Sequence, residues 1–294
     1  MKTHFSGLSV AIATPFDNNY EIDKEAYRSH VKRMINGGVD HIVVSGTTGE
    51  SPTFSDDEYE YLISETVALA DGNVGVIAGS GSNDTEKTIR RSIMAREAGC
   101  TGLLVVSPYY NKPGQEALKR HFTMVADEGR LPVMLYNVPG RTGVNILPQT
   151  TAELSQHPYI VAIKEASNDM EQILTVMELV PDDFEIYSGD DAMTMPVMLC
   201  GGHGVVSVSA NEIPALMKSY VRACAQQNLS KARELHFKLQ PLFRANFMES
   251  NPTPVKAALN MLGFMDNRVR PPLLEVTEET EKVLKQALTD LNLL

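Results

Sequence analysis

The chain has 294 residues, of which 43% are hydrophobic and 21% charged, enough to form one large barrel-type domain or two smaller domains. Its net charge is -11 and no run of lysines and arginines forms a patch, which argues against nucleic acid and anionic membranes as partners. The three cysteines are far apart and form no CxxC pair, so neither a disulfide framework nor a metal site is expected. The N-terminal apolar run is too short for a secretory signal, and no stretch is long enough to span a bilayer. We expect a reduced, soluble, cytoplasmic protein.

Short apolar runs recur along the first two-thirds of the chain. Most are rich in Val and Ile and are nearly continuous, which is typical of parallel strands covered on both faces. The eight predicted strands are Ser9–Ala13, His41–Gly46, Val74–Gly79, Gly102–Pro108, Pro132–Asn137, Ile160–Ala166, Phe184–Gly189 and Gly204–Ala210.

Helical segments are expected between these strands. Asp23 can cap a helix that ends at Gly37-Gly38. Three further pairs have the spacing of a capping box, in which the side chains of two residues three apart satisfy each other's backbone N–H groups. These pairs are Ser55 with Glu58, Asn83 with Glu86, and Asn168 with Glu171.

Eight strands that alternate with helices favour a (β/α)8 TIM barrel over residues 1–228. A doubly wound open sheet is the alternative, but its polar residues would gather at one switch point, whereas here they follow several strands. Residues 229–294 contain no convincing strand and three helical stretches. We therefore expect a small C-terminal helical domain over residues 229–294.

The active site of such a barrel lies where its strands end. The apolar run Val161–Ile163 leads into Lys164, and lysines are seldom buried. A lysine amine in a partly apolar site can attack a carbonyl to form a Schiff base. Tyr136 could carry protons in such chemistry, and the turn at Thr47-Thr48 could hold the carboxylate of a keto acid.

Each of these residues also has an ordinary structural interpretation. A single lysine at a strand end is most often solvated, and a single tyrosine most often packs in a core or an interface. Asp190 and Asp191 are expected only to cap the next helix. A catalytic role is favoured because Lys164, Tyr136 and the two threonines would all lie at one end of the same barrel.

Several motifs, in their order and spacing, resemble the dihydrodipicolinate synthase group of the pyruvate-dependent class I aldolases. The resemblance covers essentially the whole chain. It implies a TIM barrel with a helical C-terminal domain, assembled as a homotetramer built from two dimers, and it implies no cofactor. The motifs are GTTGES (46–51), SPYYNKPGQE (107–116), LYNVPGRTG (135–143), IKEAS (163–167), SGDD (188–191), GGHGVVSVSAN (201–211) and NPTPVKAAL (251–259).

The resemblance implies a condensation of pyruvate with L-aspartate 4-semialdehyde to give 4-hydroxy-tetrahydrodipicolinate, on the way to lysine and diaminopimelate. It also assigns roles to individual residues. Lys164 is the Schiff-base lysine, and Tyr136 is a proton relay connected through Thr47 to Tyr110 of a neighbouring subunit. The substrate-binding positions are Thr48 for the pyruvate carboxylate, Arg141 for the carboxylate of the aldehyde, and Gly189 and Val206 near the lysine.

Many members of this group are inhibited by L-lysine at a cleft between two subunits. Lysine-sensitive members have a glutamate where this chain has Lys87, and commonly a ring at position 56. A cationic side chain that faces the ammonium group of the effector would repel it, so inhibition should be weak or absent. The matching positions here are Ser51, Pro52, Asp56, Tyr59, Asn83, Lys87 and Tyr109.

Three other functions are compatible with parts of this pattern. An aldolase for sugar acids would keep the lysine chemistry, but such relatives generally lack an arginine at the position of Arg141. A pyridoxal-phosphate enzyme would need a phosphate site, and none is evident. A pyruvate sensor without turnover would not need both Tyr136 and Tyr110.

Overall fold

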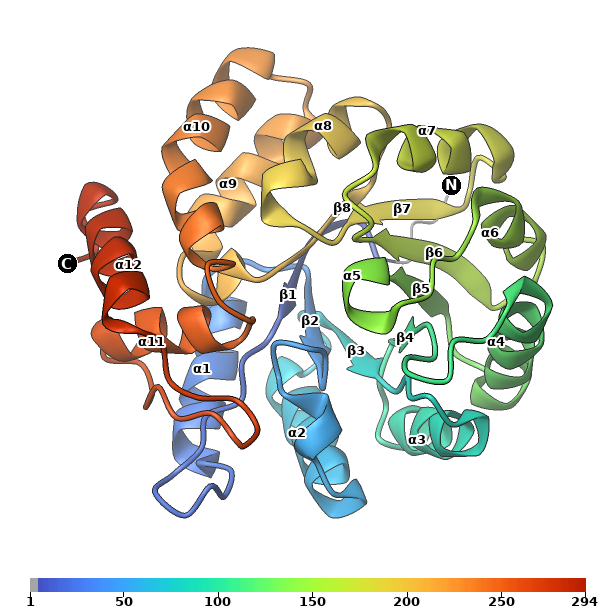
Figure 1. Ribbon diagram of the computed structural model, residues 1–294, viewed down its shortest axis with the longest axis horizontal. Coiled ribbons are helices and arrows are strands. Elements are labelled where there is room, and N and C mark those ends of the chain that lie inside the picture. The colour runs from blue at the N-terminus through green and yellow to red at the C-terminus, as the bar shows by residue number, and fades with distance from the viewer. Residues whose placement is uncertain (1–4) are drawn as a thin grey trace.

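A computed structural model describes residues 5–294 and contains a closed barrel of eight parallel strands (Figure 1). Neighbouring strands pair in sequence order, and β8 returns to pair with β1. The TIM barrel expected from the sequence is therefore confirmed, and the open sheet is excluded. The strands are β1 (Gly7–Ala11), β2 (His41–Val44), β3 (Gly75–Gly79), β4 (Gly102–Val106), β5 (Val133–Asn137), β6 (Ile160–Glu165), β7 (Glu185–Ser188) and β8 (Gly204–Ser207).

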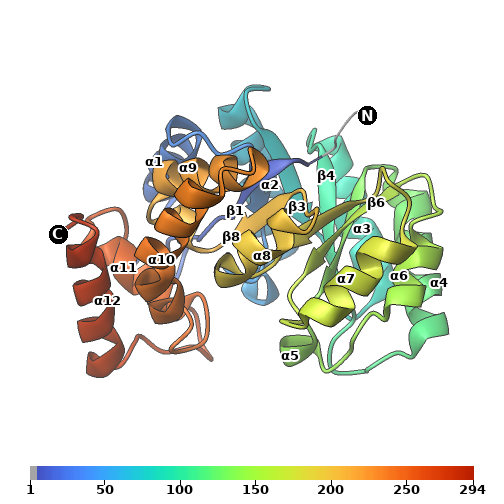
Figure 2. The same ribbon diagram turned by 90° about the horizontal axis from the view of Figure 1, so that it is seen from above.

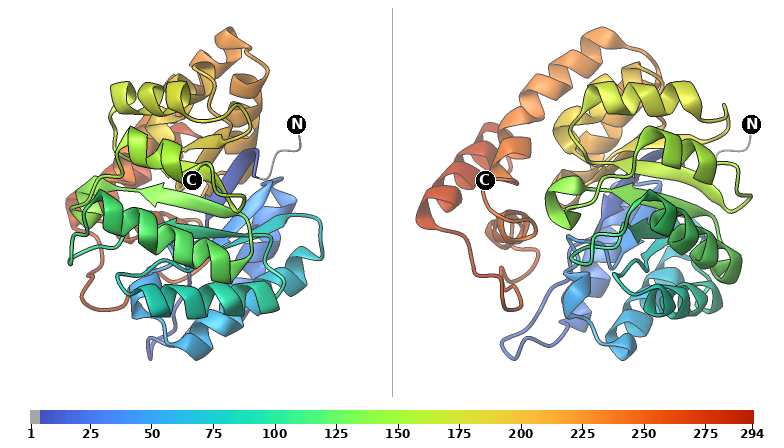
Figure 3. Two further views of the ribbon diagram at one scale, coloured as in Figure 1. Left: turned by 90° about the vertical axis from the view of Figure 1, so that its right-hand side faces the viewer. Right: turned by 45° about the vertical axis from the view of Figure 1, so that its right-hand side comes forward.

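The helices surround the barrel and continue into the C-terminal region. Figures 2 and 3 show the last three helices gathered on one side of the barrel, away from α3 and α4. The α-helices are α1 (Lys24–Asn36), α2 (Asp56–Ala70), α3 (Thr85–Glu97), α4 (Gln115–Gly129), α5 (Pro139–Thr142), α6 (Pro148–Leu154), α7 (Met170–Leu179), α8 (Thr194–Leu199), α9 (Pro214–Ala225), α10 (Leu229–Ala245), α11 (Thr253–Met261) and α12 (Glu278–Asp290). Short 3-10 turns lie at η1 (Ser51–Thr53), η2 (Asp191–Met193) and η3 (Ser209–Asn211).

Both faces of the sheet are buried, as the continuous apolar strands require. One cluster fills the inside of the barrel and includes Ile77, Met134 and Tyr187. A larger cluster packs the outer face of the strands against the helices and also includes Leu235 and Leu239 of α10. The core of the barrel thus continues into the C-terminal helices. Within residues 5–294, no helix is both long enough and apolar enough to cross a membrane.

The helix caps agree only partly with the sequence predictions. The cap at Asp23 and the capping box of Ser55 with Glu58 are both present. The other two predicted boxes are wrong. The helices instead begin one residue later, with Asp84 capping α3 and Asp169 capping α7. A charged carboxylate next to the asparagine gives a hydrogen bond to the first turn and a favourable interaction with the helix dipole.

Candidate active site

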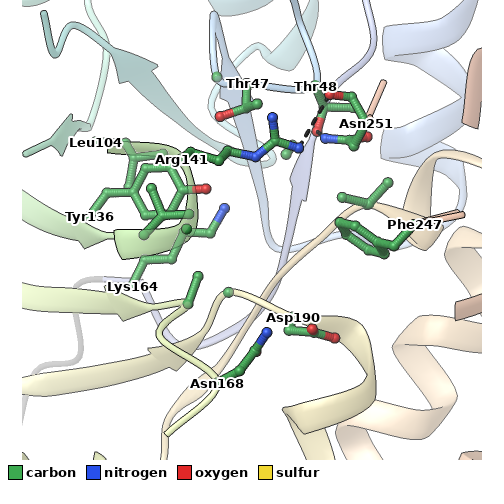
Figure 4. Close-up of a pocket in the computed structure, with 17 residues that line it drawn as sticks. Thr47, Thr48, Leu104, Tyr136, Arg141, Lys164, Asn168, Asp190, Phe247 and Asn251 are labelled. Carbon is green, nitrogen blue, oxygen red and sulfur yellow. Dashed lines mark hydrogen bonds between the residues drawn. The ribbon is translucent and has the colours of Figure 1, made fainter. Parts of the chain in front are cut away.

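A cavity of about 200 Å³ opens at the C-terminal ends of the strands (Figure 4). Its walls come from the loops after several strands and from the segment that connects α10 to α11. The cavity thus lies at the end of the barrel where the sequence predicts the site, and the C-terminal region contributes Phe247 and Asn251, which the sequence analysis did not predict. The lining residues are Ala11, Gly46, Thr47, Thr48, Leu104, Tyr136, Val138, Gly140, Arg141, Lys164, Ala166, Asn168, Gly189, Asp190, Val208, Phe247 and Asn251.

Lys164 is 5% exposed and, of the lysines that the structure describes, is the one that lines the cavity. It lies beside Tyr136 on the neighbouring strand, and its Nζ is 4.2 Å from the centroid of the tyrosine ring. Among the described residues Lys164 has no carboxylate in ion-pair distance. A buried amine without a counter-ion, aimed into a cavity, is suited to attack a carbonyl.

Gly189 gives Lys164 room to lie in the cavity. A Cβ atom at this position would lie 2.6 Å from the Cβ of Ala166 and 3.0 Å from the Cε of Lys164. Any side chain here would therefore displace the lysine or its strand. The glycine lines the cavity beside the lysine, where the resemblance places it.

The hydroxyl group of Thr48 is held by a residue from the far end of the chain. Asn251 donates a hydrogen bond from its Nδ2 to Thr48 Oγ1 over 3.0 Å, and its backbone oxygen accepts one from Arg141 Nη2 over 3.4 Å. Asn251 therefore joins the two positions expected to bind carboxylates. Sequence reasoning missed this residue, although NPTPVKAAL was among the motifs of the resemblance.

Val206 and Tyr110 lie elsewhere than the other site candidates. Val206 is fully buried inside the barrel within β8, and the cavity is lined instead by Val208, which follows the end of β8 at the mouth of the barrel. This corrects the expectation for Val206. Tyr110 is 89% exposed and does not line the cavity of its own chain.

A buried polar network supports the loop that carries Arg141. Asn137, the last residue of β5, accepts a hydrogen bond from the backbone N–H of Ile146 over 3.0 Å and donates one to Asn145 Oδ1 over 2.8 Å. It also donates to the carboxylate of Glu165, whose pKa is raised by burial. Through Asn137 these contacts connect both ends of the loop to Glu165, the residue that follows Lys164 on β6.

A buried ion pair connects the Thr47-Thr48 turn to the C-terminal region. Lys256 Nζ lies 2.8 Å from Glu50 Oε1, and the second carboxylate oxygen accepts a hydrogen bond from the backbone N–H of Arg270 over 2.8 Å. The side chains of Lys256 and Glu50 are 0% and 2% exposed. Burial lowers the pKa of Lys256. The pair joins the segment that follows Thr48 to α11, which follows Asn251.

The two aspartates after β7 differ in role. Asp190 caps η2 by accepting a hydrogen bond from the backbone N–H of Ala192 over 2.8 Å, as expected. The capping role predicted for Asp191 is wrong, because its buried Oδ2 accepts hydrogen bonds from the backbone N–H groups of Val208 and Ser209. Asp191 thus ties the loop after β7 to the loop after β8.

The residues expected at an inhibitor cleft lie on the η1 turn and on α2, α3 and the loop after β4. Asp56 pairs with Arg90 and Arg91, and Lys87 is half-buried on α3. Tyr59 is fully buried and donates a hydrogen bond to the backbone oxygen of Arg91, and burial raises its pKa. In this chain Tyr59 therefore supports Arg91 from beneath and has no open surface for a ligand.

The positions of the other cleft candidates are less enclosed. Tyr109, Ser51 and Asn83 are half-buried, and the backbone oxygen of Asn83 accepts a hydrogen bond from Asn111 over 2.8 Å. No group of three or more His, Cys, Asp or Glu side chains with the arrangement of a metal site occurs in residues 5–294.

Comparisons with known proteins agree over nearly the full length of the chain. The model of the dihydrodipicolinate synthetase family matches residues 4–291. A 4-hydroxy-tetrahydrodipicolinate synthase of Thermotoga neapolitana is 45% identical over 294 residues, covering 99% of this chain and 100% of that protein. The crystal structure of a dihydrodipicolinate synthase from Thermotoga maritima has a TM-score of 0.97 at 44% identity, covering 99% and 100% of the two chains. A crystal structure of the enzyme from Cyanidioschyzon merolae with lysine bound has a TM-score of 0.97 at 38% identity, with full coverage of both chains.

Proposed function

The chain belongs to the dihydrodipicolinate synthetase family, and we propose that it condenses pyruvate with L-aspartate 4-semialdehyde through a Schiff base on Lys164. The product is 4-hydroxy-tetrahydrodipicolinate, which makes the protein a lyase of the class I aldolase type. The observation that carries the proposal is the buried amine of Lys164, which lines the cavity beside Tyr136 and, within residues 5–294, has no carboxylate in ion-pair distance.

In this mechanism the amine of Lys164 adds to the keto carbon of pyruvate, and loss of water leaves an iminium. Release of a methyl proton gives an enamine, whose carbon forms the new bond to the aldehyde carbon while the aldehyde oxygen takes a proton. The ammonium group of the second substrate then loses a proton, and the resulting amine attacks the iminium carbon, closes the ring and releases Lys164. Among the described residues that line the cavity Tyr136 is the one phenol available for these proton transfers, and Thr47 lines the same cavity.

Two carboxylates must be bound for this reaction. Thr48 would receive that of pyruvate, since its hydroxyl is fixed by Asn251 and can still donate its proton. Arg141 would receive that of the aldehyde, because a guanidinium binds a carboxylate through two parallel hydrogen bonds. Gly189 would keep the space for Lys164 free.

The proposal is tested by trapping the iminium. The protein is mixed with pyruvate and reduced with borohydride, and its intact mass and peptide map are measured, with and without prior addition of L-aspartate 4-semialdehyde. We expect a pyruvate adduct on Lys164 that the aldehyde discharges as product forms. An adduct that persists would reject this aldehyde as the partner, and the absence of any adduct on folded protein would reject the Schiff base.

We also propose that the protein assembles as a homotetramer. Tyr110 is 89% exposed, so its ring and hydroxyl are available for contact with another molecule. A neighbouring subunit of a homotetramer would bury it and bring its hydroxyl towards Thr47. Residues 229–294 are proposed as a small helical domain beside the barrel, in a cytoplasmic enzyme. Sedimentation of the wild type and of Tyr110→Ala would measure whether this contact holds subunits together.

Inhibition by L-lysine is expected to be weak or absent in the wild type. If the cleft is where the resemblance implies, Lys87 would present a cation to the ammonium group of the effector, and Tyr59 is buried beneath Arg91. Introducing Lys87→Glu should lower the concentration of L-lysine that halves the activity by about tenfold, since an attractive charge replaces a repulsive one. Steady-state rates against L-lysine concentration would check this. Sub-millimolar inhibition of the wild type that Lys87→Glu leaves unchanged would contradict it.

A further inference from the structure

The cavity contains a single carboxylate. Among its lining residues only Asp190 is acidic, and Lys164 and Arg141 are the two cations. Figure 4 shows Asp190 across the cavity from Arg141, below Phe247. The reactive amine, the guanidinium and the carboxylate thus lie on three different sides of one enclosed space.

One of the two carboxylate oxygens of Asp190 forms a hydrogen bond within the protein. Its Oδ1 accepts the hydrogen bond from Ala192, and its backbone is held by Ser188, whose Oγ donates to the backbone oxygen of Asp190 over 2.6 Å. In the part of the chain that the structure describes, Asp190 forms no ion pair and its Oδ2 has no hydrogen-bond donor. A carboxylate fixed in place, with one oxygen free and no cation beside it, can bind a positively charged ligand group.

The second substrate of the proposed reaction carries three groups. The aldehyde must meet the enamine on Lys164, and the carboxylate has Arg141. The third group, an α-ammonium, has three N–H donors and no acceptor, and enclosing it without acceptors would be costly. Resting on the proposed function, we infer that Asp190 binds this ammonium group and thereby selects an amino aldehyde over aldehydes without a charge at that position.

The alternative is that Asp190 only caps η2. The substitution Asp190→Asn separates the two roles, because asparagine keeps an oxygen that can accept from Ala192 and is itself a favoured cap residue, but it removes the charge that would bind an ammonium group. Asp169→Asn is a matched control. Asp169 also caps a helix through one carboxylate oxygen, at Gln172, and it does not line the cavity.

The experiment compares L-aspartate 4-semialdehyde with succinate semialdehyde, which has the same chain and carboxylate but no ammonium. For Asp190→Asn we expect kcat/KM for L-aspartate 4-semialdehyde to fall by about tenfold to a hundredfold, the usual effect of losing a hydrogen bond to a charged group. The inhibition constant of succinate semialdehyde and the formation of the pyruvate adduct should change less than about twofold, because neither involves an ammonium group. Asp169→Asn should match the wild type in all three measurements.

Two results would overturn the inference. An equal loss of affinity for both aldehydes would assign Asp190 to the fold alone, and an unchanged kcat/KM for L-aspartate 4-semialdehyde would place its ammonium elsewhere. The proposed function is judged separately, by whether the wild-type adduct is discharged by L-aspartate 4-semialdehyde. If the proposed function is wrong, the wild-type experiment shows this before any variant is compared.

Discussion

Replacing Lys164 by methionine is expected to reduce kcat/KM by a factor of about 10³ or more, because no other lining residue of the cavity offers an amine to pyruvate. Methionine has similar length and suits the buried position, where the lysine is 5% exposed and packs against the ring of Tyr136. The protein should therefore stay folded. Mass spectrometry after treatment with pyruvate and borohydride should find no adduct at position 164.

Lys238→Met is the matched control for this variant, since Lys238 is an exposed lysine on α10 and lies outside the cavity. It should keep both the activity and the adduct. An Lys164→Met protein that is folded by circular dichroism and still turns over at a tenth of the wild-type rate or faster would show that the chemistry does not depend on this amine.

The barrel itself could be predicted from the sequence because its signals are local. Each strand is a continuous apolar run, and all eight were located within a few residues of their observed bounds. The misplaced caps at Asn83 and Asn168 have a local cause as well. In each case an aspartate follows directly, and its charge favours it as the cap. Neither error changes the fold, because a helix that begins one residue later still covers the same face.

The site was predictable only where a residue follows a strand. Lys164 lies near the end of β6, and Thr47, Thr48, Arg141 and Gly189 follow the ends of β2, β5 and β7, so the fold brings all of them to one end of the barrel. Asn251 could not be found in this way, because it lies 203 residues from Thr48 and in no barrel loop. The sequence also does not show which residue near the end of β8 reaches the cavity. In the structure Val208, just after the strand, lines the cavity, whereas Val206 lies deeper in the barrel.

At the ion pair of Glu50 with Lys256, single substitutions are expected to lower the free energy of unfolding much more than the double substitution does. Removing one partner, as in Lys256→Met or Glu50→Gln, leaves a buried group without its partner and should lower the free energy of unfolding by about 3–5 kcal/mol. In Lys256→Met the second oxygen of Glu50 keeps its hydrogen bond from Arg270, and in Glu50→Gln the one remaining side-chain oxygen can still accept it. The double variant Glu50→Gln/Lys256→Met buries no charge at this position and should recover to within about 1–2 kcal/mol of the wild type. Urea unfolding at one fixed protein concentration would measure all four proteins, since assembly makes stability depend on concentration.

The same set of variants connects this ion pair to the active site. Glu50 is two residues from Thr48 and Lys256 is five from Asn251, so the pair sets the distance between the turn and the segment that hydrogen-bond each other over 3.0 Å. In the double variant, folded but without this constraint, KM for pyruvate should rise by about threefold to tenfold, because the Thr48 hydroxyl is held less firmly. The pH dependence of kcat should not move, since Tyr136 and Lys164 lie on strands that the substitutions do not touch. Single variants as stable as the double would show that water reaches the pair, and an unchanged KM for pyruvate would confine its role to holding the C-terminal helices on the barrel.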